Sequence, residues 1–592
     1  MSEHGGEKEV ASNMSSHEPV SKNKSSRTIR TRNRVTKDLI ISRLGTFLLA
    51  LLAASVVLLT KRYDLESLIG SAIGQKWTGD TLSNSQDSQG TPMREYAVCT
   101  RHKSGIYTVE ESSVSSEETS ETRTTQCLVV GIDGIILSTG SIDSIKESHP
   151  SIRPTFLPKH AIVVPGLVDS HTHIMEYGWS RALNLDGATG VQDVISRVRE
   201  YVLKKEAEGM RFDDTTWIEG VGWDQNKWPG WTGGFPTYKD IEADPVLRGK
   251  PIILFRIDLH AVWVSKRVLE LCGKLPETVD GGEIIVDTDG KATGVFLDNA
   301  QLLIPRPDWS VAQMREFYQR TMQDVLSLGL TAVHEASTIE PMIKVYKMIA
   351  EEGGLPVRMH LMAHKPIGYL GDDIERFDHF GKHKRLHLRS VKLITDGAIG
   401  SWGAAMYEPY SDNPSTSGFM LISTETLRHD IHKYLEGGWQ VNTHCIGDRS
   451  NGILLDIFED ALRGRDVQVL RPRIEHAQIF RPDDLKRVGE LGLIASVQPK
   501  HATSDMVYAN ARLGDRVKTS YAYRSLIESG ARIALGSDMP VESANPLVTF
   551  HAAVTRVNAT GQSPQGPGGW YPDQKLTRHQ ALKGMSIHLL PN

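Results

Sequence analysis

The chain has 592 residues, of which 23% are charged and 39% are hydrophobic, and its formal net charge is −5 at pH 7. This length allows two or three domains with a large core, and the composition is that of a globular protein rather than a disordered or fibrous one. The four cysteines have no framework spacing, so the sequence implies no disulfide scaffold. No nucleic-acid-binding module is recognisable, so we expect no nucleic-acid partner.

The N-terminal region combines a basic stretch with a long apolar one. Eight Lys or Arg residues lie between Lys22 and Arg43 against one acid, Asp38, and residues 44–60 carry no charge. As a helix, such a segment spans about 25 Å, which is the lower limit for crossing a bilayer. A cleaved signal peptide and a buried core helix are the alternatives. The long charged region before the segment and the polar flanks on both sides favour a membrane anchor.

We therefore predict a disordered cytoplasmic tail over 1–43, a single transmembrane helix over 44–60 and a stalk over 61–93. The excess of basic residues on the N-terminal side predicts a type II membrane protein whose body is lumenal or extracellular. On that side, the sequon at Asn558 is a candidate for glycosylation, whereas the two sequons in the tail would stay unmodified.

Short alternating runs between residues 94 and 160 predict a small β domain. The pair Asp133-Gly134 between two of these runs is typical of a hairpin turn. Cys99 and Cys127 both lie in this domain and could pair if it is lumenal. We expect ordinary buried thiols at both positions instead.

From residue 161 to the C-terminus, apolar strands alternate with helical patterns. The candidate strands are 162–168, 216–221, 252–256, 331–334, 357–362, 391–394, 439–443, 473–475, 493–497 and 532–536. The candidate helices are 191–204, 311–328, 340–352, 424–436, 451–463 and 482–491. This alternation predicts a parallel sheet, and its length predicts a (β/α)₈ barrel of the TIM type over 161–592. Ten strands exceed the eight places of such a barrel, so we assign about 210–305 to an insertion.

Ligand-type side chains stand at the ends of several of these strands. His171 and His173 follow the first apolar strand, and period two along a strand sends both imidazoles to one face. Other strands end in or contain Lys392, His444, His476 and Asp538. Each residue taken alone is better explained as a core, capping or solvent-reaching side chain. Because the carboxyl ends of barrel strands meet at one edge, a shared divalent cation explains the whole set.

Long motifs carry a family resemblance over about 94–586. They are PGLVDSHTH at 165–173, WIEGVGWDQNKW at 217–228, RIDLHAVWVS at 256–265, VKLITDGAIGS at 391–401, THCIGDRS at 443–450, RIEHAQ at 473–478 and GSDMPVES at 536–543. The chain resembles the amidohydrolase superfamily. More narrowly, it is similar to the YtcJ-like branch, amidohydrolase family 3, which includes N-substituted formamide deformylases.

The resemblance implies a set of residues that bind one or two divalent metal ions, usually zinc: His171, His173, Lys392, His444, His476 and Asp538. It further implies that Lys392 is carboxylated where two metals bind, since a carbamate can bridge them. Asp538 is implied as the catalytic residue that orients a water molecule, accepts its proton and returns it to the leaving group.

The expected function is therefore metal-dependent hydrolysis of carbon–nitrogen bonds other than peptide bonds in a small amide-type substrate. His260, Trp223 and Asp224 of the inserted region are candidate substrate contacts. The alternatives are a non-catalytic, membrane-tethered relative, or the same fold hydrolysing another bond by deamination or ester cleavage. The sequence sets neither the substrate nor the oligomeric state.

The resemblance also predicts a departure at the C-terminus. Chains of this family continue past the segment that matches residues 577–586 and add strands to the small domain. We therefore expect an incomplete β-sandwich with an exposed sheet edge over 94–160.

Overall fold

The computed structural model describes residues 95–109, 124–132, 134–232, 234–365, 368–371 and 374–586. The predicted tail, membrane segment and stalk, 1–43, 44–60 and 61–93, lie outside these ranges. Within them, no helix is both long and apolar enough to cross a membrane. All of the described residues belong to one compact unit, Met93–Asn592.

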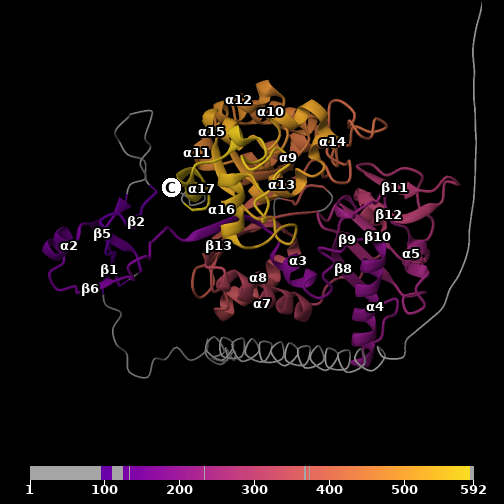
Figure 1. The fold of residues 1–592 in the computed structure, drawn as a ribbon, viewed down its shortest axis with the longest axis horizontal. Coiled ribbons are helices and arrows are strands. Elements are labelled where there is room, and N and C mark those ends of the chain that lie inside the picture. Colours follow the sequence, from indigo (N-terminus) through magenta and orange to yellow (C-terminus); the bar gives the residue numbers. More distant parts are fainter. Residues whose placement is uncertain are drawn as a thin grey trace, which may run out of the picture. The chain divides into compact units, whose positions relative to one another are not determined.

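Eight parallel strands form the predicted barrel, which is nearly closed. In sheet order they are β7 (Leu167–Thr172), β13 (Leu330–Thr338), β14 (Arg358–Ala363), β16 (Leu386–Ile394), β17 (Gln440–Cys445), β18 (Arg473–His476), β19 (Ile494–Val497) and β20 (Arg532–Leu535). Figure 1 labels one of these strands, β13, and many of the helices that pack around the barrel. A short strand, β15 (Phe377–Phe380), pairs antiparallel with β16. The first and last strands meet at their carboxyl ends, where the Asp538 N–H donates to His171 O at 2.8 Å and the His173 N–H donates to Met539 O at 2.9 Å.

Helices follow the barrel strands, and the longer ones bury one apolar face each. They are α3 (Ile174–Ser180), α7 (Val311–Ser327), α8 (Glu340–Glu352), α9 (Thr424–Glu436), α10 (Asp448–Ala461), α11 (Val467–Leu470), α12 (Pro482–Glu490), α13 (Pro499–Asp505), α14 (Ala509–Leu513), α15 (Tyr523–Glu528), α16 (Pro546–Thr555) and α17 (Arg578–Gly584), with 3₁₀ turns at η4 (Gly514–Thr519) and η5 (Pro572–Gln574). Local sequence sets their starts: Ser310 and Gln313 form a capping box before α7, and the Ser423 hydroxyl accepts from Thr426 N–H before α9.

The first barrel strand begins later than predicted. The run 162–168 was expected to be the strand, but β7 starts at Leu167, directly after Pro165 and Gly166. Proline has no N–H to donate to a neighbouring strand, so it does not continue a central sheet. As a consequence, His171 lies within β7 rather than beyond its end.

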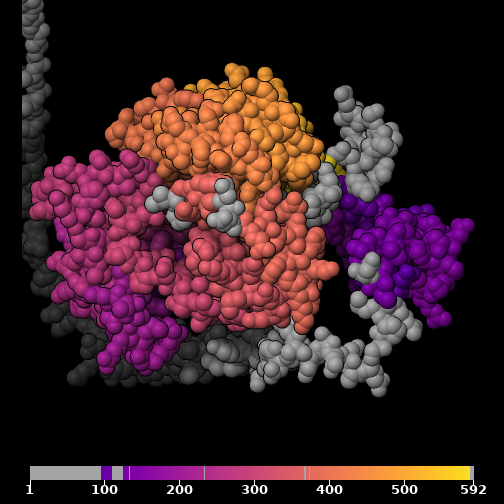
Figure 2. Space-filling view, turned by 180° about the vertical axis from the view of Figure 1, so that it is seen from behind, coloured from indigo at the N-terminus to yellow at the C-terminus, as the bar shows by residue number. Residues whose placement is uncertain are grey.

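The two surplus strands belong to a separate sheet in the inserted segment. Its order is β11 (Gly282–Val286), β12 (Ala292–Asp298), β10 (Ala261–Val264), β9 (Ile252–Arg256) and β8 (Ile218–Trp223). Helices α4 (Val191–Ala207), α5 (Tyr238–Glu242) and α6 (Lys266–Cys272), with η2 (Gln225–Lys227) and η3 (Asn299–Leu303), accompany it. Figure 2 shows this segment, in magenta, beside the salmon and orange surface of the barrel. The Arg512 guanidinium donates to Asn226 Oδ1 at 2.9 Å across that boundary.

The small β domain contains a four-stranded sheet of β5 (Ile136–Gly140), β4 (Cys127–Val130), β1 (Tyr96–Cys99) and β6 (Pro154–Phe156). It also has a two-stranded ribbon of β2 (Ile106–Tyr107) and β3 (Thr124–Thr125), and helix α2 (Ile142–Ser148). The edge strand β5 exposes Ile136 and Leu137 to solvent. The prediction of free thiols is wrong, because Cys99 and Cys127 form a disulfide. They are direct cross-strand partners of β1 and β4, and this register brings their side chains together.

Candidate metal centre

The structure brings all six predicted metal-site residues to the carboxyl-terminal edge of the barrel. His171 lies near the end of β7, Lys392 in β16, His444 in β17 and His476 at the end of β18. His173 follows β7, and Asp538 follows β20. Because neighbouring strands are parallel and in register, residues distant in sequence meet at this edge.

Short distances connect these residues. One ligand atom each from His171, His476 and Asp538 lies within 4.8 Å of the others. Asp538 Oδ1 lies 3.1 Å from His173 Nε2 and 3.4 Å from His171 Nε2. Lys392 Nζ lies 3.4 Å from His171 Nε2. The rings of His444 and His476 are 4.4 Å apart between centroids, so His444 belongs to the same cluster.

The chemistry of this donor set fits a divalent cation. Burial lowers the pKa of His171 to about 4, and burial likewise holds the pKa values of His444 and His476 well below the usual range. Neutral imidazole is the metal-binding form of histidine. His444 Nε2 and His476 Nδ1 are buried and have no hydrogen-bond partner among the described residues. This is costly for polar atoms unless a ligand fills the space between them.

Strained backbone holds two of the ligands in position. Asp538 has a φ of 62° and His476 a φ of 70°, both in the left-handed region that non-glycine residues rarely adopt. Gly536 is needed for a different reason: a Cβ there would lie 2.7 Å from the backbone nitrogen of His171. The strand ends therefore approach one another more closely than larger side chains would allow.

A buried ion pair between Glu475 and Arg473 orients His171. The sequence analysis assigned no role to either member of this pair. The Glu475 carboxylate accepts from His171 Nδ1 at 2.7 Å through Oε2, and its Oε1 lies 2.7 Å from Arg473 Nε. Burial opposes ionisation, but the charge of Arg473 and the His171 hydrogen bond hold the pKa of Glu475 below its usual range. A carboxylate at Nδ1 fixes the tautomer that directs the lone pair of Nε2 towards the centre. The sequence did contain a sign of this role, since Glu475 directly precedes His476 at the end of a strand.

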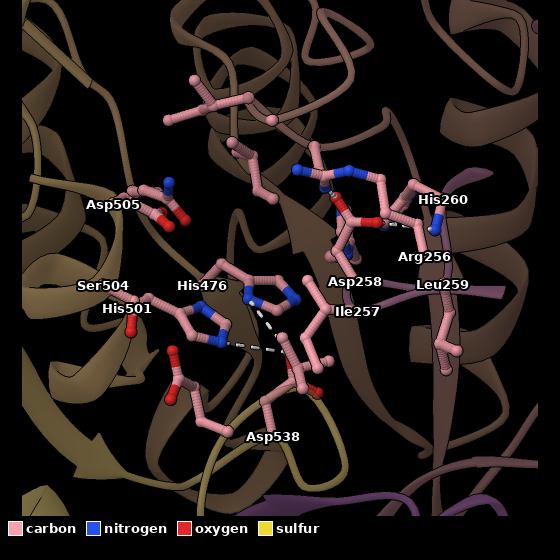
Figure 3. A pocket seen from close by; sticks show the side chains of 18 of the residues that line it. Arg256, Ile257, Asp258, Leu259, His260, His476, His501, Ser504, Asp505 and Asp538 are labelled. Atoms are coloured by element: carbon pink, nitrogen blue, oxygen red, sulfur yellow. Dashed lines mark hydrogen bonds and ion pairs between the residues drawn. The ribbon is translucent and has the colours of Figure 1, made fainter. Parts of the chain in front are cut away.

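His501 is a second functional candidate that was not predicted. It lies in α13, directly after β19, and its Nε2 is 3.6 Å from Asp538 Oδ2 (Figure 3). Its ring also stacks parallel to that of His476. The position just beyond the seventh barrel strand was the clue, because His173 and Asp538 also follow the ends of their strands.

A cavity of about 210 Å³ opens over the cluster, with one wall from the barrel and the other from the inserted segment. In Figure 3, His501, Ser504 and Asp505 stand on one side, and Arg256, Asp258 and His260 stand on the other. The apolar side chains of the lining include Ile257, Leu259, Ile394, Ile399, Ile446 and Val541.

The three predicted substrate contacts divide between two environments. Asp224 and His260 line the cavity. Trp223, in contrast, lies in the core of the inserted sheet, fully buried, where its Nε1–H donates to Leu254 O at 2.7 Å. Successive residues point in opposite directions, so Trp223 at the end of β8 faces inwards while Asp224 faces the cavity.

Asp298 holds His260 in place. Its Oδ1 lies 2.5 Å from His260 Nδ1, and this carboxylate is buried. Burial would lower the pKa of His260, but the charge of Asp298 raises it to about 9. His260 therefore stands in the cavity wall as a cation at neutral pH, with its ring 5.2 Å from that of His444.

Several known proteins resemble this chain in sequence, and a solved structure resembles it in fold. The B. subtilis (strain 168) protein YtcJ is 30% identical over 76% of this chain and 84% of its own length. The N-substituted formamide deformylase of Arthrobacter pascens is 24% identical, over 72% of this chain and 78% of its own length. A solved structure described as an uncharacterized metal-dependent hydrolase from Pyrococcus horikoshii OT3 is 28% identical. It covers 83% of this chain and 91% of its own, with a TM-score of 0.60. Residues 159–588 match the amidohydrolase family, and the chain belongs to that family of metal-dependent hydrolases.

Proposed function

We propose that the protein hydrolyses carbon–nitrogen bonds other than peptide bonds in small amide- or formamide-type substrates, with zinc as its metal. The observation that carries this proposal is the convergence of His171, His476 and Asp538 at one end of the barrel, with ligand atoms within 4.8 Å of one another. The similarity to a formamide deformylase supports the bond type. The neutral imidazoles and the carboxylate form a donor set typical of catalytic zinc.

The roles of the residues follow from their positions. A divalent metal held by the cluster would lower the pKa of a water molecule and polarise the substrate carbonyl. Asp538 is the base that accepts the water proton and later gives it to the leaving nitrogen. Although burial opposes ionisation, the neighbouring histidines hold its pKa well below the usual range, so it is a carboxylate at neutral pH. His260 donates a hydrogen bond to the substrate from the opposite wall.

We further propose that Lys392 is carboxylated and completes the site for a second metal. It is 3% exposed, and burial lowers its pKa, which increases the fraction of neutral amine able to react with carbon dioxide. Its Nζ already lies beside His171 Nε2. Mass spectrometry of the native protein, with and without bicarbonate, would detect the added carboxyl group.

Metal analysis and a substrate panel test the main proposal. Purified protein should contain a divalent metal, and it should release amine from one or more small amides, formamides or cyclic ureas in a chelator-sensitive reaction. Asp538→Asn should retain metal but lose turnover, whereas Asp515→Asn, which alters an exposed carboxylate in η4, should behave as wild type. Protein without bound metal or chelator sensitivity would instead indicate the non-catalytic alternative.

We also propose that the described body is lumenal or extracellular, anchored by residues 44–60. The Cys99–Cys127 disulfide supports this placement, because disulfides persist in oxidising compartments. The Asn558 sequon lies in a turn with Ala559 and Thr560 exposed. Expression in a eukaryotic cell should give a glycosidase-sensitive mass shift that Asn558→Gln abolishes. An unmodified Asn558 together with a reduced cysteine pair would contradict the proposed topology.

A further inference from the structure

The cavity over the metal centre adjoins a second, larger cavity. The second has a volume of about 450 Å³. Five residues line both cavities, and we call them the boundary residues: Lys227, Ile257, Ser504, Val541 and Glu542. The predicted metal-site residues line the first cavity and not the second. A molecule that reaches into both would place one end at the cluster and the other end outside it.

The lining of the second cavity differs in chemistry from that of the first. Tyr177, Ser180 and Asn184 come from α3 and the loop after it, and Ser543 comes from the segment that follows Asp538. The hydroxyl protons of Tyr177 and Ser180 already bond to Asp324 and to Tyr177 O, so these two oxygens offer acceptor positions. The oxygens of Asn184 and Ser543 accept from backbone N–H groups, so the amide NH₂ and the hydroxyl proton of these residues offer donor positions. An alkyl group placed there would remove water from these groups without replacing its hydrogen bonds, which is unfavourable.

The three basic side chains around the second cavity are each paired with a carboxylate. Lys227 Nζ lies 3.6 Å from Asp224 Oδ2, and Lys500 Nζ lies 3.3 Å from Glu542 Oε2. Arg181, which is exposed, has a carboxylate partner in Asp324 at 3.8 Å. The lining also contains Asp186, an exposed carboxylate without an ion-pair partner among the described residues, so an ammonium group is the one charged alternative that the binding test has to exclude. Any other charged ligand group would have to compete with one member of a pair already in place. An uncharged polar group avoids that competition and can use the hydrogen-bonding positions that remain on these side chains.

We propose that the second cavity is a substrate subsite for an uncharged, hydrogen-bonding arm, bearing hydroxyl or amide groups, of an elongated amide. The scissile bond would lie in the first cavity, and this part of the inference rests on the proposed function. The apolar boundary residues Ile257 and Val541 would contact the apolar middle of such a molecule. The arm determines affinity, and the cluster determines the reaction.

Binding to the metal-loaded full chain tests the inference. Four N-acetylated amines of equal length would be compared by calorimetry in an Asp538→Asn background. Their arms are alkyl, oligo(ethylene glycol) ending in hydroxyl, carboxylate-terminated and ammonium-terminated. We expect the hydroxyl-terminated arm to bind about tenfold more tightly than the alkyl arm, the gain from one or two net hydrogen bonds. Equal affinities, or a preference for the alkyl or either charged arm, would overturn the proposal.

Substitutions in the second cavity supply the control. Ser180→Phe fills the space from one wall and should abolish the preference for the hydroxyl-terminated arm. Ser543→Phe, at an exposed position, does the same if the first variant fails to fold. Ser196→Phe, on α4 and outside both cavities, should leave the preference intact. A preference that survives both cavity-filling variants would place the arm elsewhere. If wild-type protein cleaves none of these amides while the arm preference persists, the proposed function fails and the subsite remains.

Discussion

Replacing Glu475 by Gln tests whether the buried ion pair behind His171 controls the metal centre. The carboxylate accepts from His171 Nδ1 at 2.7 Å, and its two oxygens contact Arg473 at 2.7 and 3.0 Å. Glutamine keeps the shape but has one acceptor oxygen, and its NH₂ group would face another donor. Removing the carboxylate behind a metal-binding histidine typically lowers affinity 10- to 100-fold, or about 1.4–2.8 kcal/mol. Leaving the buried Arg473 unpaired costs about 3–5 kcal/mol of stability.

Two measurements separate these effects. Competition with a chromogenic chelator gives the metal dissociation constant, and thermal unfolding with excess chelator gives the stability of the metal-free protein. Glu219→Gln is the matched control, since Glu219 pairs with Arg306 at 2.7 Å in the inserted segment, where both side chains are partly exposed. It should change stability by about 1 kcal/mol or less and leave metal affinity unchanged. Wild-type metal affinity in Glu475→Gln would refute the assigned role of the carboxylate.

Three further predictions follow from other contacts. Asp298→Asn removes the charge that holds His260, and should lower kcat/KM about 10- to 150-fold with little change in metal content, measured by steady-state kinetics beside metal analysis. Gly536→Ala places a Cβ against His171, and should cost about 1–3 kcal/mol and weaken metal binding, measured by chemical denaturation and metal titration. Burial lowers the pKa of His360 from 6.5 to about 3. Between these pH values His360 is protonated in the unfolded chain and neutral in the folded chain. Stability should then fall by about 1.4 kcal/mol per pH unit, and His360→Phe should remove that part of the slope between pH 6 and pH 4 in denaturation curves.

The barrel could be predicted from the sequence because its strands are buried on both faces. Such strands appear as short apolar runs, and the helices between them show regular capping and periodicity. The same logic located the candidate metal site, since each predicted residue stands at or near the end of one of these runs. His501 fits that rule less closely and was overlooked, because it lies a few residues beyond its strand, at the start of a helix.

Features that depend on register or long-range contacts could not be predicted in this way. The Cys99–Cys127 disulfide requires β1 and β4 to pair with these residues opposite one another. Trp223 and Asp224 are neighbours in one motif, yet the motif does not show which faces the cavity. Asp298 has no local sign of its function, and only the pairing of β10 with β12 brings it to His260.

The candidate metal-site residues and the residues of the facing cavity wall come from different parts of the chain. All six predicted metal-site residues belong to the barrel, whereas Asp224, Arg256 and His260 come from the inserted segment. Arg256 is buried and paired with both Asp224 and Asp258, so this wall is fixed by its own ion pairs rather than by the metal ligands. Substitutions in the inserted wall can therefore alter which substrate fits without displacing the candidate metal-site residues. Relatives with similar barrel motifs and different insertions would then share a reaction while differing in substrate.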